Sequence, residues 1–307
     1  MTTHTIHARG YLMILASSIL FGTYGIWSVI MGDQFDVFFQ GWVRCAIVLV
    51  ILLPLVYFTK SYRKIRRQDW KWVLVTVGFA IFTQAPLYYA FNTTSIGTAT
   101  LIFYSMFIIT SYLMGRLFLG EKITKVKLAA IALAFLGLAL VFGLSLAQFS
   151  LLGMLMAVLN GIASGGEVSS TKKTTDKYPS LLITTYVWVG IFISHLIMSL
   201  VMGETQWAPE LSPAWLAMVA FAIAGLAAFW LVVEGFKFVE ASIGSLIGLL
   251  EIIWGVIFGI VLFHEHAGPT VWLGAAIIIL AGMLPDLANI IAGKKKKFPG
   301  VEPVREL

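Results

Sequence analysis

Ten apolar stretches of about twenty residues follow one another along the chain, and they constrain its fold more than any other feature. A membrane-spanning helix needs roughly 20 consecutive, mostly apolar residues. Only 12% of the residues are charged, whereas ordinary soluble domains carry about 25%. The sequence therefore predicts an all-α integral membrane protein with ten transmembrane helices. The stretches occupy residues 11–31, 36–58, 71–91, 97–118, 125–143, 150–171, 180–203, 213–236, 241–263 and 270–291.

Every second connection between these stretches contains lysine or arginine. The connections at 32–35, 92–96, 144–149, 204–212 and 264–269 contain neither residue, whereas the intervening connections and the C-terminal tail are basic. Cytoplasmic loops are enriched in Lys and Arg. We therefore expect both termini in the cytoplasm and a multi-pass protein of the cell inner (plasma) membrane. Because the basic residues lie between apolar spans, the net charge of +6 does not indicate nucleic-acid binding.

The two halves of the sequence repeat each other. Residues 115–141 align with residues 259–285 at an offset of 144, which places Glu121 opposite Glu265. A repeat of five spans enters the membrane upside down the second time, and such inverted repeats place a substrate site between the halves. The predicted organisation is a first five-helix repeat over 1–146, a second over 147–293, and a basic cytoplasmic tail over 294–307.

These paired strips, the segment LLEIIWGVIFGIVLFHEH (249–266) and Arg44 in the second span resemble the drug/metabolite transporter superfamily, specifically its ten-helix EamA-type members. The resemblance implies transport of a small metabolite across the inner membrane, often outward. Relatives commonly have proline after the ninth-helix glutamate, where this chain has Ile252, and proline in the fourth helix, where it has YSMFII (104–109). We expect straighter helices at both positions.

Glu251 is the most deeply placed acid in the chain. It lies about ten residues into its span, which at 1.5 Å per residue is roughly 15 Å deep, half of a ~30 Å hydrocarbon core. A charge there costs on the order of 2.5–3.5 kcal/mol. We expect Glu251 to bind substrate or couple proton movement to transport. The alternative is a structural ion pair with Arg44, which lies at a compatible depth in its own span.

Polar and aromatic residues inside other spans are candidate cavity lining. Aromatic faces can hold a cation, and Pro86 can kink the third span and free a backbone carbonyl. Glu167 lies among small residues, in ASGGEVSS (163–170), which leave room for solvent or for close helix contact. For the aromatic residues the alternative is interfacial anchoring. The further substrate-binding or coupling candidates are Tyr24, Trp27, Gln84, Tyr88, Tyr104, Asn160 and Trp254.

The function expected from these features is secondary active transport of a small amphipathic or cationic metabolite of the amino acid or amine class. We expect export by alternating access, with proton coupling and exchange both open. The alternatives are a membrane-embedded lipid-modifying enzyme, which would need a convergent catalytic set, and a passive channel. We expect a monomer without catalytic residues, cofactor or metal. Its expected partners are the small substrate and the bilayer, with anionic headgroups at the basic segments 60–71 and 294–297.

Overall fold

The computed structural model describes residues 3–94, 96–143, 150–264 and 266–291, and every regular element in these ranges is an α-helix. The predicted tail 294–307 and Glu265 lie outside the described residues. The helices are α1 (Thr3–Gly22), α2 (Tyr24–Met31), α3 (Val37–Phe58), α4 (Trp70–Ala80), α5 (Ala85–Thr93), α6 (Ile96–Leu119), α7 (Lys125–Phe142), α8 (Leu151–Thr175), α9 (Ser180–Val201), α10 (Pro213–Gly235), α11 (Ala241–Gly248), α12 (Leu250–Phe263) and α13 (Pro269–Ile291).

The helices form a multi-pass membrane bundle. Within the described residues, nine helical segments are long and apolar enough to cross a membrane. They coincide with the first nine predicted spans, and three of them consist of two helices each: α1–α2, α4–α5 and α11–α12. α13 contains a shorter apolar stretch, Pro269–Pro285, at the place of the tenth. The all-helical membrane class is therefore confirmed, while the tenth span remains a prediction.

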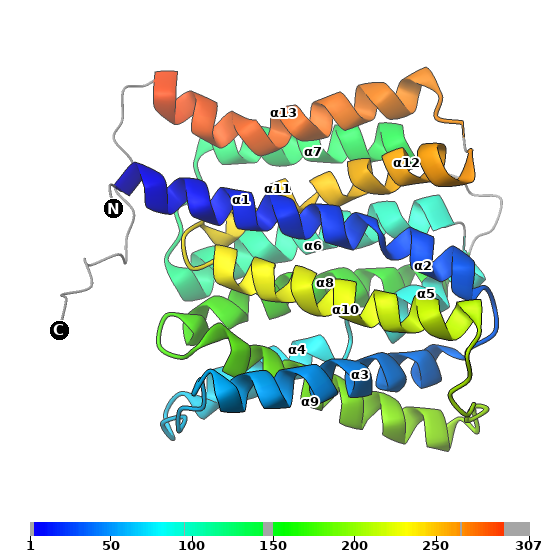
Figure 1. Cartoon of the computed structure of the whole chain (residues 1–307). Helices are drawn as coiled ribbons and strands as arrows, with labels where there is room; N and C mark the ends of the chain where they lie inside the picture. Colours follow the sequence, from blue (N-terminus) through cyan, green and yellow to red (C-terminus); the bar gives the residue numbers. More distant parts are fainter. Residues whose placement is uncertain (1–2, 95, 144–149, 265, 292–307) are drawn as a thin grey trace.

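The long helices lie alongside one another (Figure 1). α7 packs on α13 at one edge of the bundle and α3 packs on α9 at the other, with α1, α6, α8, α10 and α12 between them. The connections after α3, α6, α8 and α10 lie at the end where α1 begins and α13 ends (Figure 1). These connections contain the lysines and arginines, so we call this the basic end and the other the opposite end.

Glycines bring the helices close together. A Cβ added at Gly137 of α7 would lie 2.9 Å from the Gly274 carbonyl oxygen of α13, and one added at Gly274 would lie 2.7 Å from the Gly137 oxygen. Lipid tails are as apolar as leucine, so membrane helices associate through close packing of this kind rather than through the hydrophobic effect. The α7–α13 pair is therefore held by direct backbone contact.

The largest apolar cluster joins helices of both predicted repeats. Ile108 of α6 and Leu138 of α7 pack with Leu246 of α11, Ile252 of α12 and Ile278 of α13. All are fully buried except Ile252, which is 6% exposed. The two predicted repeats consequently share one core instead of forming separate units.

The fourth span is continuous, as the absence of proline predicts, but the expectation of a straighter ninth span is wrong. α11 and α12 meet at Leu249, which has φ −58° and ψ −16°. The Ile252 amide donates to the Leu249 carbonyl at 3.1 Å, three residues back. A 3₁₀-type bond of this kind tightens the turn and interrupts the α-helix without a proline.

Candidate substrate site

Three interrupted spans place predicted site residues inside the bundle. Tyr24 is the first residue of α2, Gln84 directly precedes α5, and Glu251 lies in the first turn of α12. Irregular backbone at membrane depth is tolerated where it is buried in protein or lines a cavity. Discontinuous helices of this kind form the binding sites of many secondary transporters.

The interruption between α4 and α5 is held by side chains from two other helices. Asn160 of α8 donates from Nδ2 to the Phe82 carbonyl at 3.2 Å, and Arg44 of α3 donates to Gln84 Oε1 at 2.8 Å. Pro86 lies in the first turn of α5, where its missing N–H costs nothing. The predicted kink at Pro86 is present, and Asn160 and Gln84 lie at it.

Arg44 is buried and has no acidic partner among the described residues. Its side chain is 5% exposed, its Nε donates to the Gln40 carbonyl at 3.2 Å, and its guanidinium carbon lies 4.1 Å from the centre of the Phe221 ring. No carboxylate of the described residues forms an ion pair with it. The ion pair with Glu251 that we considered from the sequence is thus not formed in this structure.

Tyr24 lies among the ionisable residues of the interior. Its hydroxyl is within electrostatic range of Arg44, Tyr88, Glu251 and Glu167. These four residues come from α3, α5, α12 and α8, so Tyr24 connects the sequence-predicted residues of both halves. We call these five residues together the central cluster.

Two neighbours of the central cluster were missed from the sequence. The Phe221 ring of α10 packs edge-on against Tyr24 with ring centres 4.3 Å apart. Gly225, one turn further along α10, leaves the space for the Tyr24 hydroxyl, which would lie 2.7 Å from a Cβ added there. Neither residue is polar; the small residues of the eighth span could have indicated Gly225, whereas no comparable signal marks Phe221.

The two carboxylates of the central cluster have no cationic partner in the described part of the chain. Glu251 is half-buried, and its carboxylate accepts a hydrogen bond from the Tyr104 hydroxyl of α6. Glu167 is 6% exposed, and no hydrogen bond or ion pair reaches its carboxylate from the described residues. Asn160 is completely buried, and its Oδ1 also lacks a partner in the described part of the chain. Acceptors are therefore available here for a ligand that donates hydrogen bonds.

The two predicted tryptophans make their contacts at the helix junctions. Trp27 donates from Nε1 to Thr23 Oγ1 at 3.0 Å and packs in an apolar cluster with residues of α3 and α10. Trp254 lies at the crossing of α12 with α1, where its Cβ is 2.5 Å from a Cβ built on Gly22. Both tryptophans border the central cluster through the segment that contains Tyr24.

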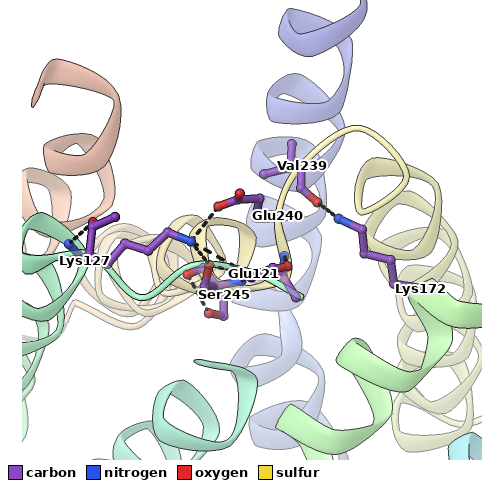
Figure 2. A network of polar contacts seen from close by, with 9 residues as sticks. Glu121, Lys127, Lys172, Val239, Glu240 and Ser245 are labelled. Atoms are coloured by element: carbon purple, nitrogen blue, oxygen red, sulfur yellow. Dashed lines mark hydrogen bonds and ion pairs between the residues drawn. The ribbon is translucent and has the colours of Figure 1, made fainter. Parts of the chain in front are cut away.

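A second polar site lies at the basic end and joins the two halves (Figure 2). Glu121, between α6 and α7, caps the first turn of α11. Its carboxylate accepts from the amides of Ala241 at 2.7 Å and Ser242 at 3.1 Å, and from Ser242 Oγ at 2.6 Å. Glu121 therefore caps a helix that is distant from it in the sequence.

Two lysines complete this basic-end network. Lys127 of α7 forms an ion pair with Glu240 at 2.6 Å and donates to Ser242 Oγ at 2.8 Å. Lys172 of α8 donates to the Val239 carbonyl at 2.6 Å (Figure 2). The segment that leads into α11 is consequently fixed by three other parts of the chain.

The described residues contain no group of three His, Cys, Asp or Glu side chains arranged to hold a metal ion. The candidate site consists of an arginine, two glutamates and several aromatic residues.

Comparison with known proteins places this arrangement among transporters. The model of the EamA-like transporter family matches residues 8–143 and 151–284. Two proteins named "Uncharacterized transporter", from two strains of Helicobacter pylori, are each 23% identical to this chain, over 299 and 297 residues. Each comparison covers 94% of this chain and 97% of the relative. One crystal structure of a protein superimposes with a TM-score of 0.77 at 14% identity, covering 93% of this chain and 99% of the other, which shows a shared fold.

Proposed function

The chain belongs to the EamA-like transporter family, and we propose from this that it exports a small amphipathic metabolite of the amino acid class by alternating access. The family and the named relatives support a membrane transporter. They favour transport over the lipid-modifying enzyme and the passive channel considered above. The substrate class, the direction and the coupling are the proposal.

The charges of the central cluster carry the proposal. Within the described ranges Arg44 has no carboxylate partner and supplies one positive group, whereas Glu251 and Glu167 have no cationic partner and supply two negative groups. Ionisable residues inside a membrane are expensive and are typical of substrate or ion sites. A zwitterion would complete this set, since its carboxylate would pair with Arg44 and its ammonium group with a glutamate. An amine alone would leave Arg44 unpaired.

The helix packing supports inverted repeats over 1–146 and 147–293. Exchange of the two proposed halves maps the fifth span onto the tenth and the second onto the seventh, and these are the pairs α7–α13 and α3–α9. The same exchange converts the contact between α1 and α10 into one between α8 and α4. It converts the contact between α6 and α8 into one between α12 and α1, and all four contacts are present. Such a pseudo-symmetric arrangement supports alternating access by rocking of the halves around a central site.

Glu251 is the proposed coupling residue. It lies in the first turn of α12 and is hydrogen bonded to Tyr104 rather than to a cation. A carboxylate so placed can hold either a proton or the substrate ammonium group, which would couple proton entry to substrate exit. We place the protein in the inner membrane as a monomer with both termini in the cytoplasm. Exchange of one substrate for another is the alternative mode.

Two experiments test the proposal: a thermal-shift screen identifies the substrate, and flux measurements in proteoliposomes then test the coupling. A ligand that binds only the folded protein raises the apparent stability of the protein, by about 2.7 kcal/mol at a ligand concentration of a hundred times its Kd. A thermal-shift screen of the purified protein against amino acids, amines and carboxylic acids therefore identifies the substrate. We then expect its flux to respond to an imposed pH gradient, and Glu251→Gln to abolish that response.

Glu210→Gln is the matched control, because Glu210 is exposed in a loop at the opposite end. We expect it to keep both the flux and its response to pH. Flux that ignores the gradient, together with a fully active Glu251→Gln variant, would contradict proton coupling by Glu251. Thermal stabilisation by amines but by no amino acid would contradict the zwitterion.

A further inference from the structure

A cavity lies at the basic end, away from the central cluster. It has a volume of about 200 Å³ and is lined by Arg63, Lys64, Arg66, Asp69, Lys177 and Tyr178. The first four belong to the connection between α3 and α4, and the last two to the connection between α8 and α9. A water molecule's share of liquid volume is roughly 30 Å³, so the cavity can hold a group of several heavy atoms.

The cavity has an excess of positive charge. Four cations and one carboxylate line it, and the carboxylate of Asp69 is taken by Lys177, whose Nζ lies 2.7 Å from Oδ1. No carboxylate in the described ranges forms an ion pair with Arg63, Lys64 or Arg66. Three cations therefore line the cavity without an ion pair among the described residues, and the excess of positive charge favours binding of an anion.

The walls of the cavity are fixed in place. Tyr178 donates from its hydroxyl to Asp69 Oδ2 at 2.8 Å, and the same hydroxyl accepts from the Arg66 amide at 3.0 Å. Ile65, between the cationic residues, is 5% exposed and packs in an apolar cluster with Tyr178 and Leu182. Because Ile65 and the Arg66 amide are held, the neighbouring cations project from an ordered backbone. Less of the ligand's binding energy is then lost in ordering the loop.

Exposed aromatic residues place the cavity at the level of the lipid headgroups. Trp and Tyr are enriched where a membrane meets water. The end of α3 exposes Tyr57 by 77% and Phe58 by 78%, the connection exposes Tyr62 by 70%, and the start of α4 exposes Trp70 by 37%. An anion reaching the cavity can therefore come from a lipid whose acyl chains lie beside these aromatic side chains.

We propose that this cavity binds the phosphate group of an anionic membrane lipid such as phosphatidylglycerol. The guanidinium groups of Arg63 and Arg66 can each donate two parallel hydrogen bonds to phosphate oxygens, and Lys64 adds a point charge. Lys177 is already paired with Asp69. The bound lipid contacts the α3–α4 and α8–α9 connections at once and so joins the two proposed halves at the basic end.

The test measures lipid binding to the full-length protein purified in a zwitterionic detergent. The test variant is Lys64→Gln/Arg66→Gln, because neither side chain makes a hydrogen bond or ion pair in the described part of the structure and the unliganded fold should persist. The probe is dioleoyl phosphatidylglycerol, titrated while the unfolding temperature is recorded. We expect it to raise the unfolding temperature of the native chain, and its apparent affinity to fall about tenfold or more in the variant.

Three comparisons decide the result. Lys122→Gln/Lys125→Gln removes the same charge from exposed positions at the same end and should keep the native affinity. Lys64→Arg/Arg66→Lys keeps the charge and should lose much less affinity than Lys64→Gln/Arg66→Gln, although its lysine cannot reproduce the paired hydrogen bonds of Arg66; this separates charge loss from misfolding. Dioleoyl phosphatidylcholine should have no effect. Equal affinities of the native chain and Lys64→Gln/Arg66→Gln would overturn the proposal. So would an equal response to inorganic phosphate, which would instead indicate a site for soluble phosphates.

Discussion

Arg44 is the residue that most narrows the choice of substrate. Its guanidinium is oriented by the Gln40 carbonyl, Gln84 Oε1 and the Phe221 ring. None of these contacts neutralises its charge. If Arg44 binds a substrate carboxylate, its planar guanidinium can donate two parallel hydrogen bonds, and replacement by lysine should lower the affinity for that carboxylate.

We therefore expect Arg44→Gln and Arg44→Lys to affect amino acids and amines differently. The affinity for an amino acid substrate should fall at least about tenfold in Arg44→Gln and less in Arg44→Lys, since loss of a charge-assisted hydrogen bond costs about 1.5–3 kcal/mol. Binding of the matching decarboxylated amine should change little. Thermal-shift titration with the two ligands measures both. Equal losses for both ligands would indicate that Arg44 only supports the fold around Gln84.

Asp69 predicts how the stability of the basic end depends on pH. Hydrogen bonds from Lys177 and Tyr178 hold the pKa of the Asp69 carboxyl below its ordinary value. The ionised form is thus stabilising above the unfolded pKa of about 3.9, and the contribution is lost as the pH falls through the folded pKa. Asp69→Asn should lower the unfolding temperature by a constant amount at neutral pH, and the difference should shrink below about pH 4.

Asp33→Asn is the control for this pH profile, because Asp33 is exposed in the first connection at the opposite end. Its unfolding temperature should follow that of the native chain throughout. Scanning fluorimetry at a series of pH values gives all three profiles. A difference between the native chain and Asp69→Asn that grows on acidification would have the wrong sign and would rule out the ion pair as its source.

Individual site residues could be predicted from the sequence better than their partners could. Glu251, Glu167 and Arg44 are conspicuous because a charge in a membrane span is costly. The contact of Arg44 with Gln84, however, depends on the rotation of α3 and on the interruption after α4. Hydropathy fixes neither of these, so from the sequence an ion pair with Glu251 stayed open as the alternative role of Arg44.

At the scale of helices, the start of α11 is held by side chains from several other parts of the chain. Its first two amides donate to Glu121, and the segment before it is held by Lys127 and Lys172. Carboxylates are favourable at helix N-termini because of the unpaired N–H groups and the helix dipole. Since α11 leads directly into α12, Glu121 also fixes the helix from which Glu251 extends.

Glu121→Gln should therefore destabilise the protein although it preserves the size of the side chain. The amide presents only one acceptor oxygen to three donors, and it removes the negative charge 4.0 Å from Lys127 Nζ. We expect a loss of at least about 2 kcal/mol, measured as a lower unfolding temperature. The exposed neighbour in Lys122→Gln should stay within about 0.5 kcal/mol of the native chain. Equal stability of the two variants would show that the cap is dispensable.

Helix interruptions could be predicted only where a residue type enforces them. Pro86 indicates the junction between α4 and α5, since proline lacks an N–H and clashes with the preceding turn. The junctions at Thr23 and Leu249 contain no proline. They depend on local turns such as the bond from the Ile252 amide to the Leu249 carbonyl, for which the sequence has no comparable signal.

At the scale of the whole molecule, the spans were predictable because lipid leaves few choices. Backbone groups in the membrane must be satisfied internally, so long apolar stretches become helices. The pairing of those helices was not predictable in the same way. The contact between Gly137 and Gly274, for example, depends on which faces of α7 and α13 meet, and both helices are apolar nearly all round.

The basic end predicts the orientation of the whole bundle. The connections after α3, α6, α8 and α10 lie together there and contain lysine or arginine, whereas those at the opposite end contain neither. Because basic loops are retained in the cytoplasm, we expect the opposite end to face outward.

Single cysteines at Lys122 and Ala208 test this orientation in a chain in which Cys45 is replaced by alanine. Both positions are exposed, and they lie at the two different ends. A membrane-impermeant maleimide should label Ala208→Cys in intact cells and Lys122→Cys only after permeabilisation. The reverse pattern would contradict the predicted orientation and would place both the Glu121 cap and the proposed lipid site at the outer leaflet.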